Sequence, residues 1–377
     1  MTIKFSFGDL SVEQFLEEYW QKQVHVFRQG FENFNSPISA EELAGLACEE
    51  DVHSRIVIEK GGERPWQLID GPMDEDIFSS LPKTHWTLLV NDVEKHIPEL
   101  VNVVDAFRFI PEWRFDDLMI SYAPEGGTVG PHLDQYDVFI LQAQGHRCWQ
   151  TTTRLTSDAN QVDKADLKIQ KDFNAEQEWL LAPGDIIYIP PGVSHYGVAT
   201  DDCLSFSIGY RAPTHAEMLS SFIDHITHDL PLSKTYKDKP LEAQESPNEI
   251  KCSAIDNVRE IFKSYLDPQH PALEEWFGCF VSDSKTDFNF SLEDPIDTFN
   301  ALVVNYPVVQ RNPASRFAFY EFENKTKLFI DGISMEVSTS FAKIVCNKRE
   351  INLSSELFNT QEKDMILDFF NRGVLTD

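Results

Sequence analysis

The sequence predicts an α+β protein whose centre is a barrel of β-strands, with helical segments before and after it. Two observations predict this fold class. Between about Asp116 and Arg211, short apolar runs rich in β-branched residues alternate with turns that contain glycine and proline. On both sides of that region, apolar residues recur with helical spacing behind capping residues. The chain has 377 residues, 42% of them hydrophobic, so we expect two or three domains.

Two short helices and one strand are predicted in the first fifty residues. Ser11 and Gln14 form a capping-box pattern, which predicts a helix over residues 15–20. The run at residues 24–28 predicts a strand. Ser39 precedes Glu42 by three residues, and this spacing predicts a second capped helix that ends near residue 47.

One predicted strand, residues 131–142, carries two candidate metal ligands. Side chains two positions apart share a strand face, so His132, Asp134 and Tyr136 point the same way. Residues 182–194 then predict a turn, an apolar strand and a Pro-Pro-Gly turn that ends the strand. His195 follows and would start the next strand, facing into the barrel. The polar residues 158–176 are expected to form an excursion between barrel strands.

Two imidazoles and one carboxylate on strands match the facial triad of non-haem Fe(II) oxygenases, which keeps open positions on the metal. A His-x-Asp pattern alone is common by chance, and a lone histidine after a turn is more often a surface or hydrogen-bonded residue. The joint pattern of His132, Asp134 and His195, with the turns and strand between them, favours a metal site. Zinc is the alternative ion.

An oxygenase of this kind needs an electron-donating cosubstrate, and 2-oxoglutarate fits if a cation binds its distal carboxylate. Residues 138–150 predict a strand, a glycine-containing turn and a second strand, a hairpin that would return Arg147 to the metal-bearing strand. The planar guanidinium matches a carboxylate. The alternative interpretation of Arg147 is a rim arginine paired with one of the many acids.

After Pro213 the pattern changes to helices. Residues 214–226 and 250–265 have helical spacing of apolar residues, and a charged, proline-containing linker at 234–247 joins them. Three histidines on the first of these helices are better explained as surface residues than as metal ligands: His215, His225 and His228. Toward the C-terminus the sequence predicts strands at 317–322, 327–330 and 333–337 and a final helix through 365–370.

The formal net charge is −30, which limits the classes of partner. An acidic surface repels nucleic acid and attracts basic proteins, so we expect no direct nucleic-acid binding and favour a basic protein as partner. Acidity that serves only solubility or a salt-adapted host is the alternative.

The sequence has no apolar run of eighteen residues and no signal-peptide pattern, and we expect a cytoplasmic protein without a membrane segment. Six cysteines without C-x-x-C spacing predict reduced, buried thiols and argue against disulfides or a zinc site.

Four sequence blocks carry a resemblance to a known family. They are residues 116–122 (DDLMISY), residues 126–139 (GGTVGPHLDQYDVF), the stretch from Pro183-Gly184-Asp185 to His195, and residues 209–213 (GYRAP). Together they closely resemble the bacterial ribosomal oxygenases, which are JmjC-type, cupin-like 2-oxoglutarate enzymes related to the human ribosomal histidine hydroxylases. Specific motifs carry the resemblance up to residue 213. Beyond that point it rests on the order of elements.

The resemblance implies a fold and a division into domains. It implies a double-stranded β-helix (jelly-roll) core of the cupin and JmjC type within a catalytic domain at residues 1–213. A helical dimerisation segment at 214–290 and a winged-helix-like domain at 291–377 would follow, and the protein would be a homodimer. Because the chain is acidic and few basic residues lie on the predicted wing, a protein-contact or structural role is favoured for the last domain over DNA binding.

The resemblance also carries site residues over to matching positions. It assigns Fe(II) to His132, Asp134 and His195, and the distal carboxylate of 2-oxoglutarate to Arg147 with Ser121 as a helper. The substrate pocket of the family maps onto four residues: Asp117, Met119, Tyr136 and Ser207. Alternation agrees, because residues 117, 119 and 121 share one strand face. A surface ion pair for Asp117, core packing for Met119 and a backbone-bonded hydroxyl for Ser121 are the alternatives.

The activity implied by the resemblance is hydroxylation, with Fe(II), 2-oxoglutarate and O₂, of an arginine side-chain carbon, C3, in large-subunit ribosomal protein sixteen. Two alternatives stay open. A hydroxylase or N-methyl demethylase of this type could act on another protein, although an acidic, arginine-sized slot weakly disfavours a methyl-lysine cage. A non-catalytic cupin-type binding module would also contain the barrel, but the intact triad and Arg147 argue against it.

Overall fold

The computed structural model describes residues 3–61, 66–153, 169–284, 295–322, 325–354 and 356–377. The chain divides into two compact units, Met1–Ala212 and Pro213–Asp377. Elements of the first unit are, in chain order, α1 (Val12–Glu18), β1 (His25–Phe27), α2 (Ala40–Leu46), β2 (Ser54–Glu59), β3 (Trp66–Asp70), α3 (Glu75–Ser80), β4 (Trp86–Val90), the 3₁₀ helices η1 (Val93–Lys95) and η2 (Pro98–Leu100), α4 (Val101–Asp105), η3 (Glu112–Arg114), β5 (Phe115–Ala123), β6 (His132–Leu133), β7 (Asp137–Gln144), β8 (Arg147–Thr152), β9 (Gln177–Leu181), β10 (Ile186–Ile189), β11 (Ser194–Ala199) and β12 (Cys203–Tyr210).

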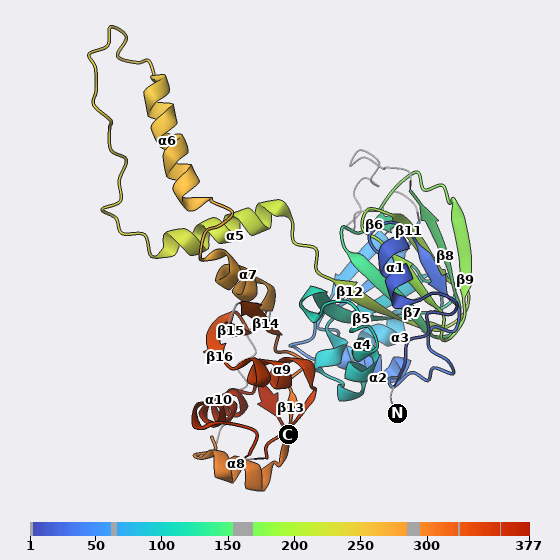
Figure 1. Cartoon of the computed structure of the whole chain (residues 1–377). Helices are drawn as coiled ribbons and strands as arrows, with labels where there is room; N and C mark the ends of the chain where they lie inside the picture. The colour runs from blue at the N-terminus through green and yellow to red at the C-terminus, as the bar shows by residue number, and fades with distance from the viewer. Residues whose placement is uncertain (1–2, 62–65, 154–168, 285–294, 323–324, 355) are drawn as a thin grey trace. The chain divides into compact units, whose positions relative to one another are not determined.

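Two antiparallel sheets form the barrel of the first unit. One has eight strands in the order β1-β10-β7-β12-β5-β4-β2-β3, and the other has four in the order β6-β11-β8-β9. From β5 to β12 the chain passes from one sheet to the other at every step except that from β8 to β9, which gives a double-stranded β-helix (Figure 1). The predicted α+β barrel is therefore confirmed.

The outer face of the eight-stranded sheet carries the main core. Strand β7 is buried along almost its whole length, and β10 along all of it, as their continuous apolar runs predict. Their aromatic side chains pack with those of the N-terminal helix, so that Phe15 lies 5.7 Å from Phe139 and 5.1 Å from Tyr188 between ring centroids. The helices thus cover one face of this sheet, and the other face remains available for a cavity inside the barrel.

The two predicted N-terminal helices are confirmed with their capping boxes. The Ser11 hydroxyl accepts from the Gln14 backbone N–H, and the Gln14 side chain accepts from the Ser11 N–H. Ser39 and Glu42 make the same reciprocal pair at the start of α2. Each cap satisfies backbone donors that the first helical turn leaves free.

The single strand predicted over residues 131–142 is wrong. The structure has two strands there, β6 and β7, and they lie in different sheets. The chain bends between them because Asp137 is buried and accepts hydrogen bonds from Gln21 Nε2 (3.0 Å), Arg114 Nη2 (3.0 Å) and the Tyr188 hydroxyl (2.6 Å). These contacts fix the start of β7, while His132 pairs with His195 in the other sheet.

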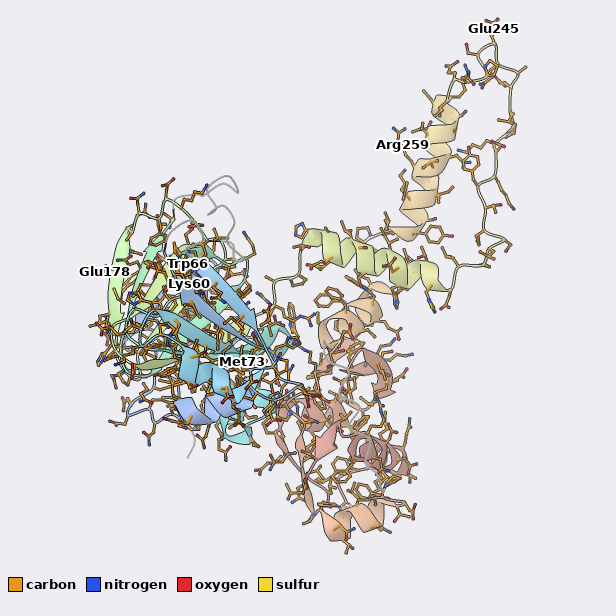
Figure 2. All side chains as sticks on the ribbon, turned by 180° about the vertical axis from the view of Figure 1, so that it is seen from behind. Lys60, Trp66, Met73, Glu178, Glu245 and Arg259 are labelled. Carbon is orange, nitrogen blue, oxygen red and sulfur yellow. The ribbon has the colours of Figure 1, made fainter. Side chains whose placement is uncertain are left out.

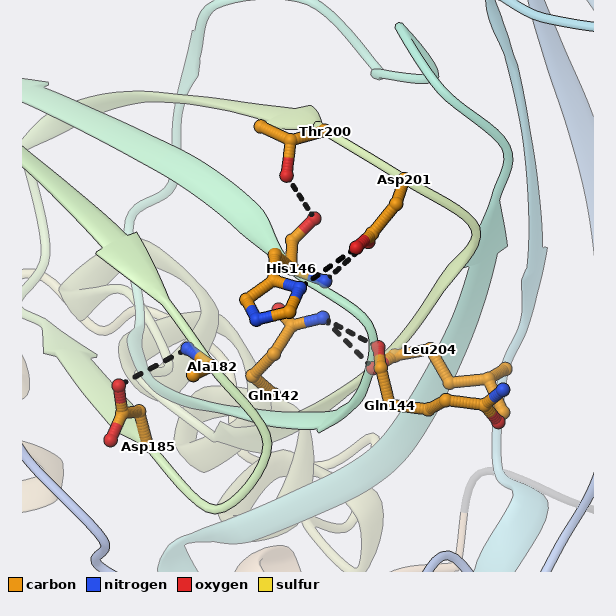
Figure 3. Close-up of polar contacts among 8 residues, drawn as sticks. All are labelled: Gln142, Gln144, His146, Ala182, Asp185, Thr200, Asp201 and Leu204. Carbon is orange, nitrogen blue, oxygen red and sulfur yellow. Dashed lines mark hydrogen bonds and ion pairs between the residues drawn. The ribbon is translucent and has the colours of Figure 1, made fainter.

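The predicted hairpin that contains Arg147 is also wrong, because β7 pairs with β10 and β12 whereas β8 pairs with β11 and β9. Gly145 has a positive φ of 65°, and a Cβ there would overlap the backbone oxygen of Asp202. Asp201 accepts from the His146 backbone N–H (2.6 Å) and from His146 Nδ1 (2.8 Å), as Figure 3 shows. This turn therefore transfers the chain between sheets and places Arg147 at the start of β8.

Figure 3 also shows how the neighbouring loops are held. Gln142 Nε2 donates to the backbone oxygens of Gln144 (2.9 Å) and Leu204 (3.3 Å). The Asp185 carboxylate accepts from the Ala182 backbone N–H (3.1 Å), closing the Pro-Gly turn before β10. On the edge strand β9, exposed Glu178 projects away from the barrel in Figure 2, whereas Leu181 is buried.

The second unit contains helices and two small sheets. Its elements are α5 (His215–His228), α6 (Cys252–Tyr265), α7 (Leu273–Ser282), α8 (Phe299–Asn305), β13 (Val308–Arg311), β14 (Phe317–Phe322), β15 (Lys325–Ile330), β16 (Ile333–Val337), α9 (Thr339–Asn347), β17 (Glu350–Asn352), α10 (Thr360–Asn371) and β18 (Leu375–Thr376). The sheets have the strand orders β17-β13-β18 and β14-β15-β16. The predicted helices at 214–226 and 250–265, the C-terminal strands and the final helix are confirmed.

Helix α6 has no buried residue, and Figure 2 shows Arg259 on it and Glu245 before it projecting from the backbone. The dimerisation role and the winged-helix-like form stay predictions.

The predicted boundary at 290–291 lies outside the described residues, as do residues 158–168 of the predicted excursion. No described helix is long and apolar enough to cross a membrane. All six cysteines are free thiols, as predicted, but the predicted burial is wrong for four of them, because only Cys203 and Cys346 are buried and Cys252 is exposed.

Candidate active site

The three predicted ligands meet at one point of the barrel. His132 and His195 lie opposite each other in the β6–β11 pair, with ring centroids 4.2 Å apart. Asp134 Oδ2 is 3.8 Å from His132 Nε2 and 3.6 Å from His195 Nε2. One ligand atom from each residue lies within 4.8 Å of the others, an arrangement that could hold a metal ion.

Both imidazoles are oriented by the backbone. The Nδ1–H of His132 donates to the Gly130 oxygen at 2.9 Å, and the Nδ1–H of His195 donates to the Val193 oxygen at 3.1 Å. A carbonyl oxygen can only accept, so Nδ1 carries a proton in both rings, and in the neutral ring Nε2 is the nitrogen with the lone pair. Such contacts fix the tautomer of a metal-ligating histidine. The backbone N–H of Gly192 donates to the Asp134 carbonyl at 2.8 Å and holds the third ligand's segment.

Burial keeps the His195 ring neutral. The side chain is 2% exposed, and this burial, with the nearby His132 ring, lowers the pKa of His195 to about 4, although the Asp134 carboxylate opposes the shift. A neutral imidazole is the form that binds a metal ion.

A cavity of about 200 Å³ extends from the triad into the barrel, and all nine predicted site residues line it. At one end lie Arg147 and Ser121, where Arg147 Nη1 donates to the Ser121 hydroxyl at 3.4 Å. The Arg147 Nε and Nη2 atoms are buried and have no hydrogen-bond partner within the described part of the chain. A buried guanidinium in this state can bind an anion that enters the cavity.

The indole of Trp149 connects the arginine end to the metal end. Its ring centroid is 5.9 Å from that of His195, and the guanidinium carbon of Arg147 is 5.8 Å from it. A Cβ at Gly197, which faces Trp149 across the β8–β11 pair, would lie 2.8 Å from the indole. The missing side chain at this glycine leaves room for the indole.

The acidic end of the cavity is built around Asp117. Asn91 Nδ2 donates to Asp117 Oδ2 at 3.0 Å, and a Cβ at Gly209 would lie 3.0 Å from Asp117 Oδ1. Met119 and Ser207 face each other across the β5–β12 pair and line the same wall. Tyr136 is 42% exposed at the rim; partial desolvation, then the negative charges of Asp134 and Asp117, raise its pKa, so the phenol stays neutral.

The sequence analysis missed four residues with polar side-chain atoms that also line the cavity: Arg55, Thr87, Asn91 and Trp149. Trp149 shares a strand face with Arg147, and this two-residue spacing could have found it. Thr87 and Asn91 belong to an apolar run, residues 86–91, whose alternation gives a common face. Nothing in that run indicates which cavity the face meets.

Comparison with known proteins agrees with this geometry. The JmjC domain family matches residues 102–218. A curated Escherichia coli protein, ribosomal protein uL16 3-hydroxylase, is 38% identical over 287 residues, which is 76% of this chain and 75% of that protein. The chain belongs to the JmjC family of ribosomal oxygenases.

Further relatives of this ribosomal oxygenase extend the similarity to the whole chain. A probable ribosomal oxygenase of Haemophilus influenzae is 35% identical over 260 residues, or 68% of this chain and 64% of that protein. The structure of YcfD, an Escherichia coli ribosomal oxygenase, superposes with a TM-score of 0.85 at 31% identity, covering 100% of this chain and 99% of that one. YcfD has also been solved in complex with cobalt and 2-oxoglutarate, and that structure matches with a TM-score of 0.85 over 99% of each chain.

The JmjC match confirms the predicted fold family, and it covers the candidate site residues. All nine predicted site residues lie between residues 102 and 218. Three residues that complete the cavity wall, Arg55, Thr87 and Asn91, lie before this range. The N-terminal strands β2 and β4 thus add to the site of this ribosomal oxygenase from outside the matched domain.

Proposed function

We propose that this ribosomal oxygenase is an Fe(II)- and 2-oxoglutarate-dependent dioxygenase that hydroxylates C3 of an arginine side chain in uL16, the large-subunit protein sixteen. One observation carries the proposal. Two histidines with free Nε2 atoms and one carboxylate meet at a cavity whose opposite end holds a buried arginine with unused donors. A metal at the first end and a dicarboxylate reaching the second would use every one of these groups.

The names of two relatives support the substrate and the cofactors. The Escherichia coli relative is named a uL16 3-hydroxylase, and the related YcfD structure contains cobalt and 2-oxoglutarate. Two imidazoles and a carboxylate are ligands that suit Fe(II), for which cobalt can stand in. When bound, iron with 2-oxoglutarate and O₂ supplies the oxidation of a C–H bond, with succinate and CO₂ as coproducts. The choice of arginine as the target residue rests on the pocket around Asp117.

The residues of this chain bind the metal and the cosubstrate and orient them. We propose that His132, Asp134 and His195 hold the iron, and that Arg147 and Ser121 bind the distal carboxylate of 2-oxoglutarate. An ion pair with a buried guanidinium fixes the long axis of the cosubstrate, so its keto acid end meets the metal. No side chain needs to act as a general base in this arrangement.

A second pocket would hold the substrate arginine. We propose that the Asp117 carboxylate pairs with the guanidinium, while Tyr136 stacks on it and Met119 and Ser207 form the wall. Asn91 holds Asp117 in one orientation through its 3.0 Å hydrogen bond. The formal net charge of −30 would attract a basic ribosomal protein over long range.

The test is incubation of the full chain with Fe(II), ascorbate, 2-oxoglutarate and unmodified large-subunit ribosomal proteins. Intact masses should show one added oxygen on uL16, and fragmentation should place it on an arginine side chain. The His132→Ala variant serves as the control and should add none. If 2-oxoglutarate is consumed and no protein gains mass, the oxygenase chemistry stands and the substrate is wrong. Loss of a methyl group from another protein would favour a demethylase.

We also propose a homodimer that works in the cytoplasm without direct nucleic-acid binding. Helices α5 and α6 expose a series of apolar side chains: Leu219, Ile223, Ile255, Val258, Ile261 and Phe262. Such a surface supports pairing with a second copy. Sedimentation of the full chain should give a dimer mass, and replacement of Phe262 and Ile261 by Asp should give a monomer. A wild-type monomer at micromolar concentration would contradict the proposal.

A further inference from the structure

Three residues that line the cavity carry buried polar atoms without a protein hydrogen bond. They are Thr87 with its hydroxyl, Arg147 with Nε and Nη2, and Trp149 with its indole N–H; within the described ranges none of these atoms has a partner. Leaving such a buried donor unpaired destabilises the folded protein. All of these groups can donate a hydrogen bond. Their convergence on one cavity indicates a ligand that accepts several hydrogen bonds.

Strand register places Thr87 at the arginine end. Leu89 pairs with Ser121 across β4 and β5, and Thr87 lies two residues from Leu89 on the same face, in the direction of Ala123. Cys203 pairs with Ala123, and Arg147 reaches this region too: burial raises the pKa of the Cys203 thiol and the Arg147 charge opposes it. Thr87 and Arg147 therefore flank Ser121.

The surroundings of Thr87 give its hydroxyl no structural purpose. Its side chain is fully buried, and its neighbours on the cavity face, Leu89 and Val57, are apolar. Valine has almost the same shape and would remove the cost of burying a hydroxyl. A threonine at this position is explained if a ligand accepts its hydrogen bond.

We propose that the Thr87 hydroxyl donates a hydrogen bond to the distal carboxylate of 2-oxoglutarate, beside Arg147 and Ser121. Arg147 supplies charge and two N–H groups, and the two hydroxyls approach the same carboxylate from strands β4 and β5. The inference rests on the function proposed above, and it adds a cosubstrate contact from a strand outside the matched JmjC domain.

The test measures binding rather than turnover. The full chain is loaded with Mn(II) under nitrogen, and calorimetry gives the dissociation constants of 2-oxoglutarate and of 2-oxopentanoate, in which a methyl group replaces the distal carboxylate. Wild type is compared with Thr87→Val, which removes only the hydroxyl, and with Thr87→Ser, which keeps it. Because both ligands are measured on the same preparation, the ratio of their dissociation constants does not depend on the folded fraction.

Thr87→Val should weaken 2-oxoglutarate binding about tenfold or more, the usual loss for a hydrogen bond to a charged group, and should leave 2-oxopentanoate binding unchanged. Thr87→Ser should stay within about twofold of wild type. An unchanged ratio in Thr87→Val, or equal weakening of both ligands, would overturn the inference. If wild type binds neither ligand, the proposed function itself fails, and the inference fails with it.

Discussion

Replacement of Glu94 by glutamine should make the first unit more stable, and increasingly so as the pH rises. Glu94 is 3% exposed, and its Oε2 accepts from the Leu118 backbone N–H at 3.0 Å. The pairing between β4 and β5 reaches only as far as Ile120 on β5. Beyond that point the Glu94 carboxyl group accepts the hydrogen bond of the β5 backbone, at Leu118 between Asp117 and Met119. A glutamine oxygen can accept the same hydrogen bond without a charge.

The magnitude follows from the pKa of this carboxyl group. Burial first, then the charge of Asp92, raise the pKa of Glu94 from 4.5 to about 8. The folded protein therefore binds a proton that the unfolded chain releases, and stability falls as the pH rises from about 4.5 to about 8. At about 1.4 kcal/mol per pH unit, wild type loses up to about 5 kcal/mol across this window, and Glu94→Gln does not.

Urea unfolding of the full chain at pH 5 to 8.5, followed by tryptophan fluorescence, measures this difference. Six of the seven tryptophans lie before residue 213, with Trp276 the exception, so the signal reports mainly on the first unit. Exposed Glu99 supplies the control, because Glu99→Gln makes the same charge change without burial. A stability difference between Glu94→Gln and wild type that stays constant from pH 5 to 8.5 would refute the reasoning.

Other substitutions test the cavity. Arg147→Ala should raise the 2-oxoglutarate KM about ten- to a hundredfold; an unchanged KM in a succinate assay would remove Arg147 from that role. Asn91→Ala should raise the uL16 KM about tenfold, because Asp117 loses its orienting donor, and leave the 2-oxoglutarate KM unchanged. A parallel rise in both constants would mean a general disturbance of the cavity. Gly197→Ala places a Cβ 2.8 Å from Trp149, so kcat/KM should fall at least about tenfold with Mn(II) affinity retained. Wild-type kcat/KM in this variant would show that the indole can shift freely.

The meeting of the three candidate metal ligands at one point could be predicted from the sequence because their signals are local. His132 and Asp134 are two residues apart, and the Pro-Pro-Gly turn fixes the start of the strand that carries His195. This prediction did not depend on the single strand predicted over residues 131–142, which is wrong. The ligands precede the bend, and only the continuation from Asp137 onward joins the other sheet.

The rest of the site depends on contacts that a local pattern cannot give. A glycine turn such as the one at Gly145 looks the same whether its two strands pair or enter different sheets, and the distant Asp201 decides between these outcomes. From the local sequence, Thr87 would be interpreted as part of a buried apolar strand, and Glu94 as an ordinary surface acid. Pairing of β4 with β5 brings Thr87 to the cavity wall, and the chain that follows β4 buries Glu94 against the Leu118 backbone N–H.

Incubation under ¹⁸O₂ tests the central claim most directly. The full chain, Fe(II), ascorbate, 2-oxoglutarate and unmodified uL16 are combined in ordinary water, and the masses of uL16 and succinate are read. A dioxygenase places one ¹⁸O atom in the protein and one in succinate, and Asp134→Ala should abolish both. Hydroxylated uL16 without ¹⁸O, or labelled succinate from the Asp134→Ala variant, would contradict the assignment of the reaction to this triad.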